Sequence, residues 1–191
     1  LQYCLDLGLL KKDGKLRPAN PIYANAMVRY LNKNIQDALP SDLIGKWMDG
    51  QNIDLSGLLE AFQQYWSLNS ERFLKGASYT EGAPHYYLAA FLQRVVNGGA
   101  TLINEFADGL GYGDILIQYA GKSYVIETKI KDNEISRAQS LEQTLRYMDG
   151  LLVNEGWLVV FDRKSEKSWK DKITWDTKIM PNGETIHVVD C

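Results

Sequence analysis

The sequence predicts an α/β fold built on a mixed sheet, and three observations lead to this interpretation. From residue 84 onward, the local patterns follow the order helix, three strands, helix, strand. The three strands are separated by turn residues and lie at 101–106, 114–119 and 124–130. A helix at 135–148 then separates the third strand from a buried strand at 157–161, and Asn182-Gly183 predicts the turn of a closing hairpin. A crossover helix implies one parallel pairing, so we expect a mixed sheet with helices on both faces.

Composition limits which functions the chain can have. The 191 residues carry 21 Lys and Arg against 24 Asp and Glu, for a net charge of −3. Such a chain has no overall attraction to nucleic acid, so a phosphate-binding surface would have to be local. No apolar run approaches the roughly 20 residues that span a bilayer, and the first residues do not resemble a signal peptide. We expect a cytoplasmic protein.

The cysteines and histidines restrict the kinds of metal site. Cys4 and Cys191 lie at opposite ends of the chain, and His85 and His187 are far apart in sequence. This excludes a disulfide framework and a Cys/His metal cage. Any metal would therefore be a hard cation that carboxylates hold.

The N-terminal part has its own pattern. Residues 3–10 predict the end of a helix, residues 11–17 a hairpin around Asp13-Gly14, and Asn20-Pro21 the start of a helix that runs to about residue 32. This order is that of the closing part of a winged-helix-like element, which we assign to residues 1–45. Residues 40–54 are expected to form a linker, and residues 55–73 and 84–97 are expected to be helices.

Charged residues converge where the second and third strands meet. If Gly121-Lys122 forms a two-residue turn, Asp114 faces Lys129 across the ladder and Glu127 lies diagonally from Asp114. Side chains alternate along a strand, so all three share one face. Neighbouring carboxylates repel each other unless a cation neutralises them, which favours a Mg²⁺ site beside a lysine. The alternative is a salt bridge between Asp114 and Lys129, with Glu127 solvated.

These residues form a pattern that is known from nucleases. Gly113-Asp114 followed by Glu127-Thr128-Lys129 resembles the motif of the PD-(D/E)xK superfamily, which has the restriction-endonuclease-like fold. The order of helices and strands from residue 84 is also that of the superfamily's αβββαβ core, which we place in residues 46–191. Gly113 replaces the proline of the superfamily's name. Leu110 and Tyr112 lie where related modules carry arginines.

Longer stretches resemble a particular group within this superfamily. Residues 7–31 are similar to the winged-helix segment that follows the ATPase module in AAA-type ATPases with a nuclease domain. Residues 85–117 and 155–163 are similar to the nuclease module itself. The resemblance implies an ATPase module that precedes this segment in a larger chain.

The resemblance also implies an activity, namely metal-dependent hydrolysis of phosphodiester bonds in nucleic acid, with DNA as the expected substrate. Asp114, Glu127 and the main-chain carbonyl of Thr128 would hold Mg²⁺ or Mn²⁺, and Lys129 would orient or deprotonate the attacking water. A second interpretation is a nuclease-like domain that no longer cuts and serves as a DNA- or protein-docking module. The acidic net charge favours this second interpretation.

Four further residues are supporting candidates. Glu81 lies where the superfamily often has a third acid, or it complements the dipole of the following helix. Glu105 faces the site or solvent. Gln143 and Tyr147 resemble a glutamine–tyrosine motif, and their helix face, which we expect to lie away from the sheet-packing leucines, contacts the substrate or is simply solvated. We expect His85 to be the partner of a nearby acid rather than a base.

Overall fold

The computed structural model describes most of the chain and divides it into two compact units, Leu1–Ser41 and Asp42–Cys191. The described residues are 2–13, 15–19, 46–74, 82–97, 99–107, 112–131, 137–162 and 168–191. The helix that the sequence predicts at residues 20–32 lies outside them. We expected the boundary between the two parts at residues 45 and 46, close to the division between the units.

The first unit contains a short helix and a hairpin. Helix α1 (Gln2–Asp6) is followed by the antiparallel strands β1 (Leu10–Asp13) and β2 (Lys15–Pro18), in which Asp13 pairs with Lys15. The helix ends earlier than residue 10, where we expected its end, because Gly8 adopts a left-handed conformation with φ of 65°. The hydrogen bond from the Gly8 amide to the Leu5 carbonyl closes the last turn.

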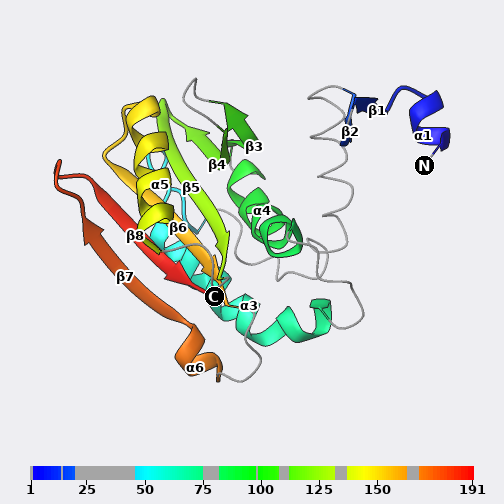
Figure 1. The fold of residues 1–191 in the computed structure, drawn as a ribbon. Helices are drawn as coiled ribbons and strands as arrows, with labels where there is room; N and C mark the ends of the chain where they lie inside the picture. The colour runs from blue at the N-terminus through cyan, green and yellow to red at the C-terminus, as the bar shows by residue number, and fades with distance from the viewer. Residues whose placement is uncertain are drawn as a thin grey trace. The chain divides into compact units, whose positions relative to one another are not determined.

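The second unit is built on a six-stranded mixed sheet (Figure 1). Its strands are β3 (Thr101–Ala107), β4 (Tyr112–Tyr119), β5 (Lys122–Ile130), β6 (Glu155–Phe161), β7 (Thr174–Ile179) and β8 (Thr185–Asp190). The spatial order is β3-β4-β5-β6-β8-β7. Strand β5 pairs with β6 in parallel, as the crossover helix predicts, and β6 also pairs with β8 in parallel. The sequence predicted only one parallel pairing, because the closing hairpin carried no sign of which edge it would join.

Helices cover both faces of this sheet, which confirms the predicted α/β class. Helix α5 (Arg137–Leu151) lies across one face, over β5, β6 and β8 (Figure 1). On β6, Leu158 packs with Met148 of α5, whereas Phe161 contacts Phe62 of α3 (Leu55–Leu74). These two β6 residues are three positions apart and therefore point to opposite faces. Helix α4 (Gly82–Asn97) joins α3 on the second face, and the short α6 (Trp169–Lys172) precedes β7.

An aromatic cluster holds α3 and α4 against the sheet. The rings of Phe62 and Phe91 lie 5.3 Å apart, and those of Trp66 and Phe161 also lie 5.3 Å apart. All four side chains are buried. Edge-to-face contacts at this distance add to the stabilisation from buried apolar area. These apolar side chains of the two helices are thus part of the core.

The turn between β4 and β5 differs from the expected one. Tyr119 pairs with Lys122, so the two-residue loop is Ala120-Gly121 and not Gly121-Lys122. Both loop residues have positive φ, 48° and 77°. Two positive φ angles are characteristic of a type I′ turn, whose twist matches that of the flanking strands. With this loop, the register of β5 against β4 is shifted by two residues from the expected one.

Residues 46–54 are more than a linker. Trp47 and Ile53 are buried, and Met48 forms an isolated antiparallel bridge with Ile53. The Ile53 amide donates a 2.9 Å hydrogen bond to the Tyr124 hydroxyl on β5. Asp54 then accepts a hydrogen bond from the Gly57 amide and caps α3. The segment therefore belongs to the core of the second unit.

None of the helices in the described parts of the chain combines the length and the apolar character that crossing a bilayer requires.

Candidate functional site

The candidate site lies where β4 and β5 separate. Their pairing ends at Ile115 and Ile126, and Asp114 is the residue that precedes Ile115 on β4. Asp114 is therefore level with Glu127. The expected register had placed it level with Lys129. Its side chain takes up the pairing that the main chain of β4 no longer supplies.

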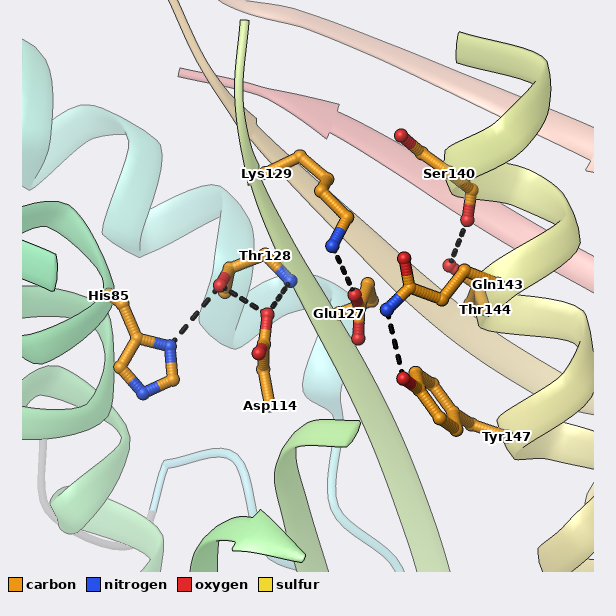
Figure 2. A network of polar contacts seen from close by, with 9 residues as sticks. All are labelled: His85, Asp114, Glu127, Thr128, Lys129, Ser140, Gln143, Thr144 and Tyr147. Atoms are coloured by element: carbon orange, nitrogen blue, oxygen red, sulfur yellow. Dashed lines mark hydrogen bonds and ion pairs between the residues drawn. The ribbon is translucent and has the colours of Figure 1, made fainter. Parts of the chain in front are cut away.

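Asp114 makes two short hydrogen bonds to a single residue of β5 (Figure 2). Its Oδ2 atom accepts from the Thr128 amide at 2.8 Å and from the Thr128 hydroxyl at 2.6 Å. Hydrogen bonds to an ionised acceptor are among the stronger ones in proteins. They fix the Asp114 carboxylate at the edge of β5.

Glu127 points to the α5 face of the sheet and is fully buried. Lys129, two residues along the same strand, donates to Glu127 Oε1 at 2.6 Å. The second oxygen, Oε2, is buried and has no hydrogen-bond partner in the described part of the chain. A buried carboxylate oxygen without a partner is costly, so this atom marks a position that a cation or a water molecule would satisfy.

The surroundings of Glu127 raise its pKa to about 7. Loss of solvation on burial is the largest cause, and the negative charge of Asp114 is the second. The ammonium group of Lys129 opposes both effects in part. Near pH 7 the Glu127 carboxyl group is therefore only partly ionised in the metal-free protein.

The salt bridge that we considered as an alternative differs from the observed one. Lys129 pairs with Glu127 and not with Asp114, and Glu127 is buried rather than solvated. The structure thus brings Asp114, Glu127 and Lys129 together, with Thr128 between them. The sequence pointed to the main-chain carbonyl of Thr128 but gave no role to its hydroxyl, which bonds to Asp114. Alternation places it on the opposite face from Glu127, but no sequence signal shows that it reaches Asp114.

Helix α5 supplies two of the supporting candidates. Gln143 Nε2 donates to the Tyr147 hydroxyl at 2.8 Å, and Gln143 points toward the Glu127 side of β5 (Figure 2). Tyr147 is buried and packs on Leu116 and Val125. The expectation that this helix face lies away from the sheet is therefore wrong for Tyr147, although Leu141 and Leu145 do pack on the core as expected.

Small residues explain how α5 turns this face inward. Ser140 and Thr144 are buried along with Tyr147, whereas Leu141 and Leu145 are only half-buried. Gly156 of β6 faces the helix, where a Cβ atom would lie 2.6 Å from the Met148 sulfur. The glycine permits a close approach that larger residues would prevent.

The other supporting candidates are placed only in part. Glu81 lies outside the described residues. Glu105 belongs to β3, at the register position between the pairs Asn104–Ile115 and Phe106–Gly113, which makes it level with Asp114. On α4, His85 Nδ1 lies 3.2 Å from the Thr128 hydroxyl, so this histidine reaches an acid through an intermediate residue.

The residues present fit a hard divalent cation better than any other metal. In the described ranges, no group of three or more His, Cys, Asp or Glu side chains is arranged to hold a metal. Two carboxylates and one main-chain oxygen are nevertheless available. The N–H and C=O of a strand residue point to the same side, so the Thr128 carbonyl lies on the edge that Asp114 occupies. The unpartnered Glu127 Oε2 would supply a third oxygen ligand.

No protein-family model matches the chain, and no curated protein matches it.

Proposed function

We propose that this protein is a metal-dependent nuclease that hydrolyses phosphodiester bonds in nucleic acid, with DNA as its expected substrate. The observation that carries the proposal is the buried Glu127 carboxylate, which has an unpartnered oxygen, a second carboxylate nearby and a lysine at 2.6 Å. A buried arrangement of this kind costs stability and has a physical purpose if it binds a cation.

The order of elements supports assigning a restriction-endonuclease-like core. Helix α4 is followed by the antiparallel strands β3, β4 and β5, then by α5 and the parallel strand β6. Asp114 lies on the second of these strands, and Glu127 and Lys129 lie on the third, as in the PD-(D/E)xK pattern. In this proposal the domain works in the cytoplasm, attached to an AAA-type ATPase module.

Each residue has a distinct role in the proposed reaction. Asp114, Glu127 and the Thr128 carbonyl would hold Mg²⁺ or Mn²⁺, and the bound ion would lower the pKa of a water molecule and offset charge on the phosphate. Lys129 is placed at the Glu127 carboxylate, where its ammonium group orients the attacking water and stabilises negative charge that develops beside it. Half-buried Gln143 would contact the substrate backbone, and buried Tyr147 would hold the Gln143 side chain in place through their 2.8 Å hydrogen bond.

A cleavage assay on matched variants tests the proposal. Purified protein is incubated with Mg²⁺ or Mn²⁺ and with single-stranded DNA, double-stranded DNA or RNA. We expect Asp114→Asn, Glu127→Gln and Lys129→Gln each to lower cleavage at least about a hundredfold. Glu142→Gln on the exposed side of α5 and Lys178→Gln on β7 are matched controls that should cleave like the wild type.

Melting curves show that each variant is folded at the assay temperature, so that lost activity is not lost structure. Cleavage that persists in all three site variants would overturn the nuclease assignment.

The docking module remains the second candidate, and one observation favours it. Lys129 is already engaged with Glu127, and no larger ligand group accompanies the two carboxylates in the described residues. This candidate predicts no thermal shift with Mn²⁺ and no cleavage of any substrate. Retained binding of DNA, or of the ATPase module, would then identify what the domain docks to.

A further inference from the structure

A chain of hydrogen-bonding groups runs from α4 to the candidate site. His85 Nδ1 lies 3.2 Å from the Thr128 hydroxyl, and that hydroxyl lies 2.6 Å from Asp114 Oδ2 (Figure 2). The three groups come from three different elements, α4, β5 and β4. Their contact therefore depends on how the helix packs against the sheet and not on a local sequence motif.

The available protons determine the direction of these bonds. An ionised carboxylate only accepts, and a hydroxyl has a single proton to donate. At 2.6 Å the Thr128 proton must point at Asp114, because two acceptors would otherwise face each other at that distance. The Thr128 oxygen is then an acceptor toward His85. His85 Nδ1 must therefore carry a proton.

We propose that His85 is a positioning residue, which acts as an Nδ1–H donor to Thr128 and thereby holds the Asp114 carboxylate in the orientation that binds the metal. The role of His85 as a hydrogen-bond donor follows from the contacts alone. The effect on metal binding rests on the proposed function. Both described hydrogen bonds of Asp114 go to Oδ2. Oδ1 takes part in neither of these bonds and would be the oxygen that binds the cation.

The ladder between β3 and β4 continues past Asp114, but toward β5 only the side chain of Asp114 makes the contact. The ladder between β4 and β5 ends at Ile115, so no main-chain pair between these strands fixes the position of Asp114. The Thr128 hydroxyl supplies one of two bonds that set its rotamer. The Thr128 hydroxyl donates to Asp114, and a donor at His85 Nδ1 holds the Thr128 oxygen from the other side.

The tautomer of His85 is the direct test. The metal-free protein is labelled with ¹⁵N, and two-bond ring correlations are recorded at about pH 8, where an ordinary histidine is neutral. The chain has only one other histidine, His187, and a spectrum of His85→Asn identifies the His85 signals. We expect a protonated Nδ1 and an unprotonated Nε2. A protonated Nε2 with an unprotonated Nδ1 would overturn the proposal.

Mn²⁺ affinity, measured by calorimetry, tests the consequence. Residues that orient metal ligands typically contribute about tenfold to a hundredfold in affinity. We therefore expect Thr128→Val and His85→Leu to weaken Mn²⁺ binding about tenfold. Thr128→Ser keeps the hydroxyl and should lose less Mn²⁺ affinity than Thr128→Val. His85→Asn keeps a donor near the Nδ1 position and should lose less than His85→Leu. Equal loss in Thr128→Val and Thr128→Ser, or in His85→Leu and His85→Asn, would contradict the hydrogen-bonded chain.

The molecule contains a matched control for the same pair of residue types. The Thr177 hydroxyl on β7 lies 3.2 Å from His187 Nδ1. Strand β7 is the edge strand of the sheet that is farthest from β4. Thr177→Val removes an equivalent contact and should leave Mn²⁺ affinity unchanged.

The two measurements separate the two proposals. Absence of Mn²⁺ binding in the wild type would count against the proposed function, while the tautomer would still decide the role of His85.

Discussion

At Glu127, burial and charge act against each other. The carboxylate is fully buried, and Asp114 adds a second negative charge, so the pKa of Glu127 rises to about 7. Lys129 compensates for part of this cost through its 2.6 Å ion pair. Such a residue lowers stability, because a neutral side chain of the same shape would fold at lower cost.

This conflict predicts a specific dependence of stability on pH. The folded pKa of about 7 lies above the ordinary value of 4.5, so between these values the folded state holds a proton that the unfolded state has lost. Stability from this group is therefore complete below about pH 4.5 and declines as pH rises to about 7, by about 3 kcal/mol in total.

Urea unfolding of the metal-free wild type and of Glu127→Gln, over about pH 4.5 to 8, measures this difference. Glutamine cannot ionise, so the variant should lack the decline and become the more stable protein at the alkaline end. Parallel curves for the two proteins would contradict a raised pKa at this position.

At the scale of elements, the approach of α5 to the sheet depends on Gly156. A Cβ atom at this position would lie 2.6 Å from Met148 Sδ and 3.4 Å from Thr144 Cγ2. Met148 is fully buried and has little room to move. The same helix carries Gln143 and Tyr147, so its distance from β6 also affects the candidate site.

Gly156→Ala should lower the free energy of unfolding by about 1–3 kcal/mol, because the added methyl group overpacks the interface. Chemical denaturation measures this cost. In a Met148→Ala background the clash is removed, so the same substitution should cost much less. Equal costs in both backgrounds would show that the contact with Met148 is not the reason.

At the scale of the whole molecule, the chain consists of two compact units. The second unit contains the six-stranded sheet, α3, α4, α5 and every described residue of the candidate site. Residues 46–54 also belong to it, through the buried Trp47 and the bond from Ile53 to Tyr124.

A protein that consists of residues 42–191 should therefore fold alone. We expect its melting temperature to lie within a few degrees of that of the full chain, and its amide spectrum to overlay the corresponding signals. Broad signals or a non-cooperative melt would show that the first unit is needed to complete the core.

The sequence by itself determined the elements and their order. The predicted strand 101–106 and β3 differ by one residue, and the Asn182-Gly183 signal lies in the turn between β7 and β8, where Gly183 has φ of 91°. It also placed Glu127 and Lys129 on one face. These features depend on residues a few positions apart, through helix or strand periodicity and turn chemistry.

Tertiary structure decided what connects distant residues. The β4–β5 turn could use either of two neighbouring loops, and the twist of the paired strands selected Ala120-Gly121. Tyr147 is buried on Leu116 and Val125, although helix periodicity alone favoured only the leucines for the sheet-facing side. The contact between His85 and Thr128 joins residues 43 positions apart. No local pattern encodes such a contact, because it arises only when α4 packs on the sheet.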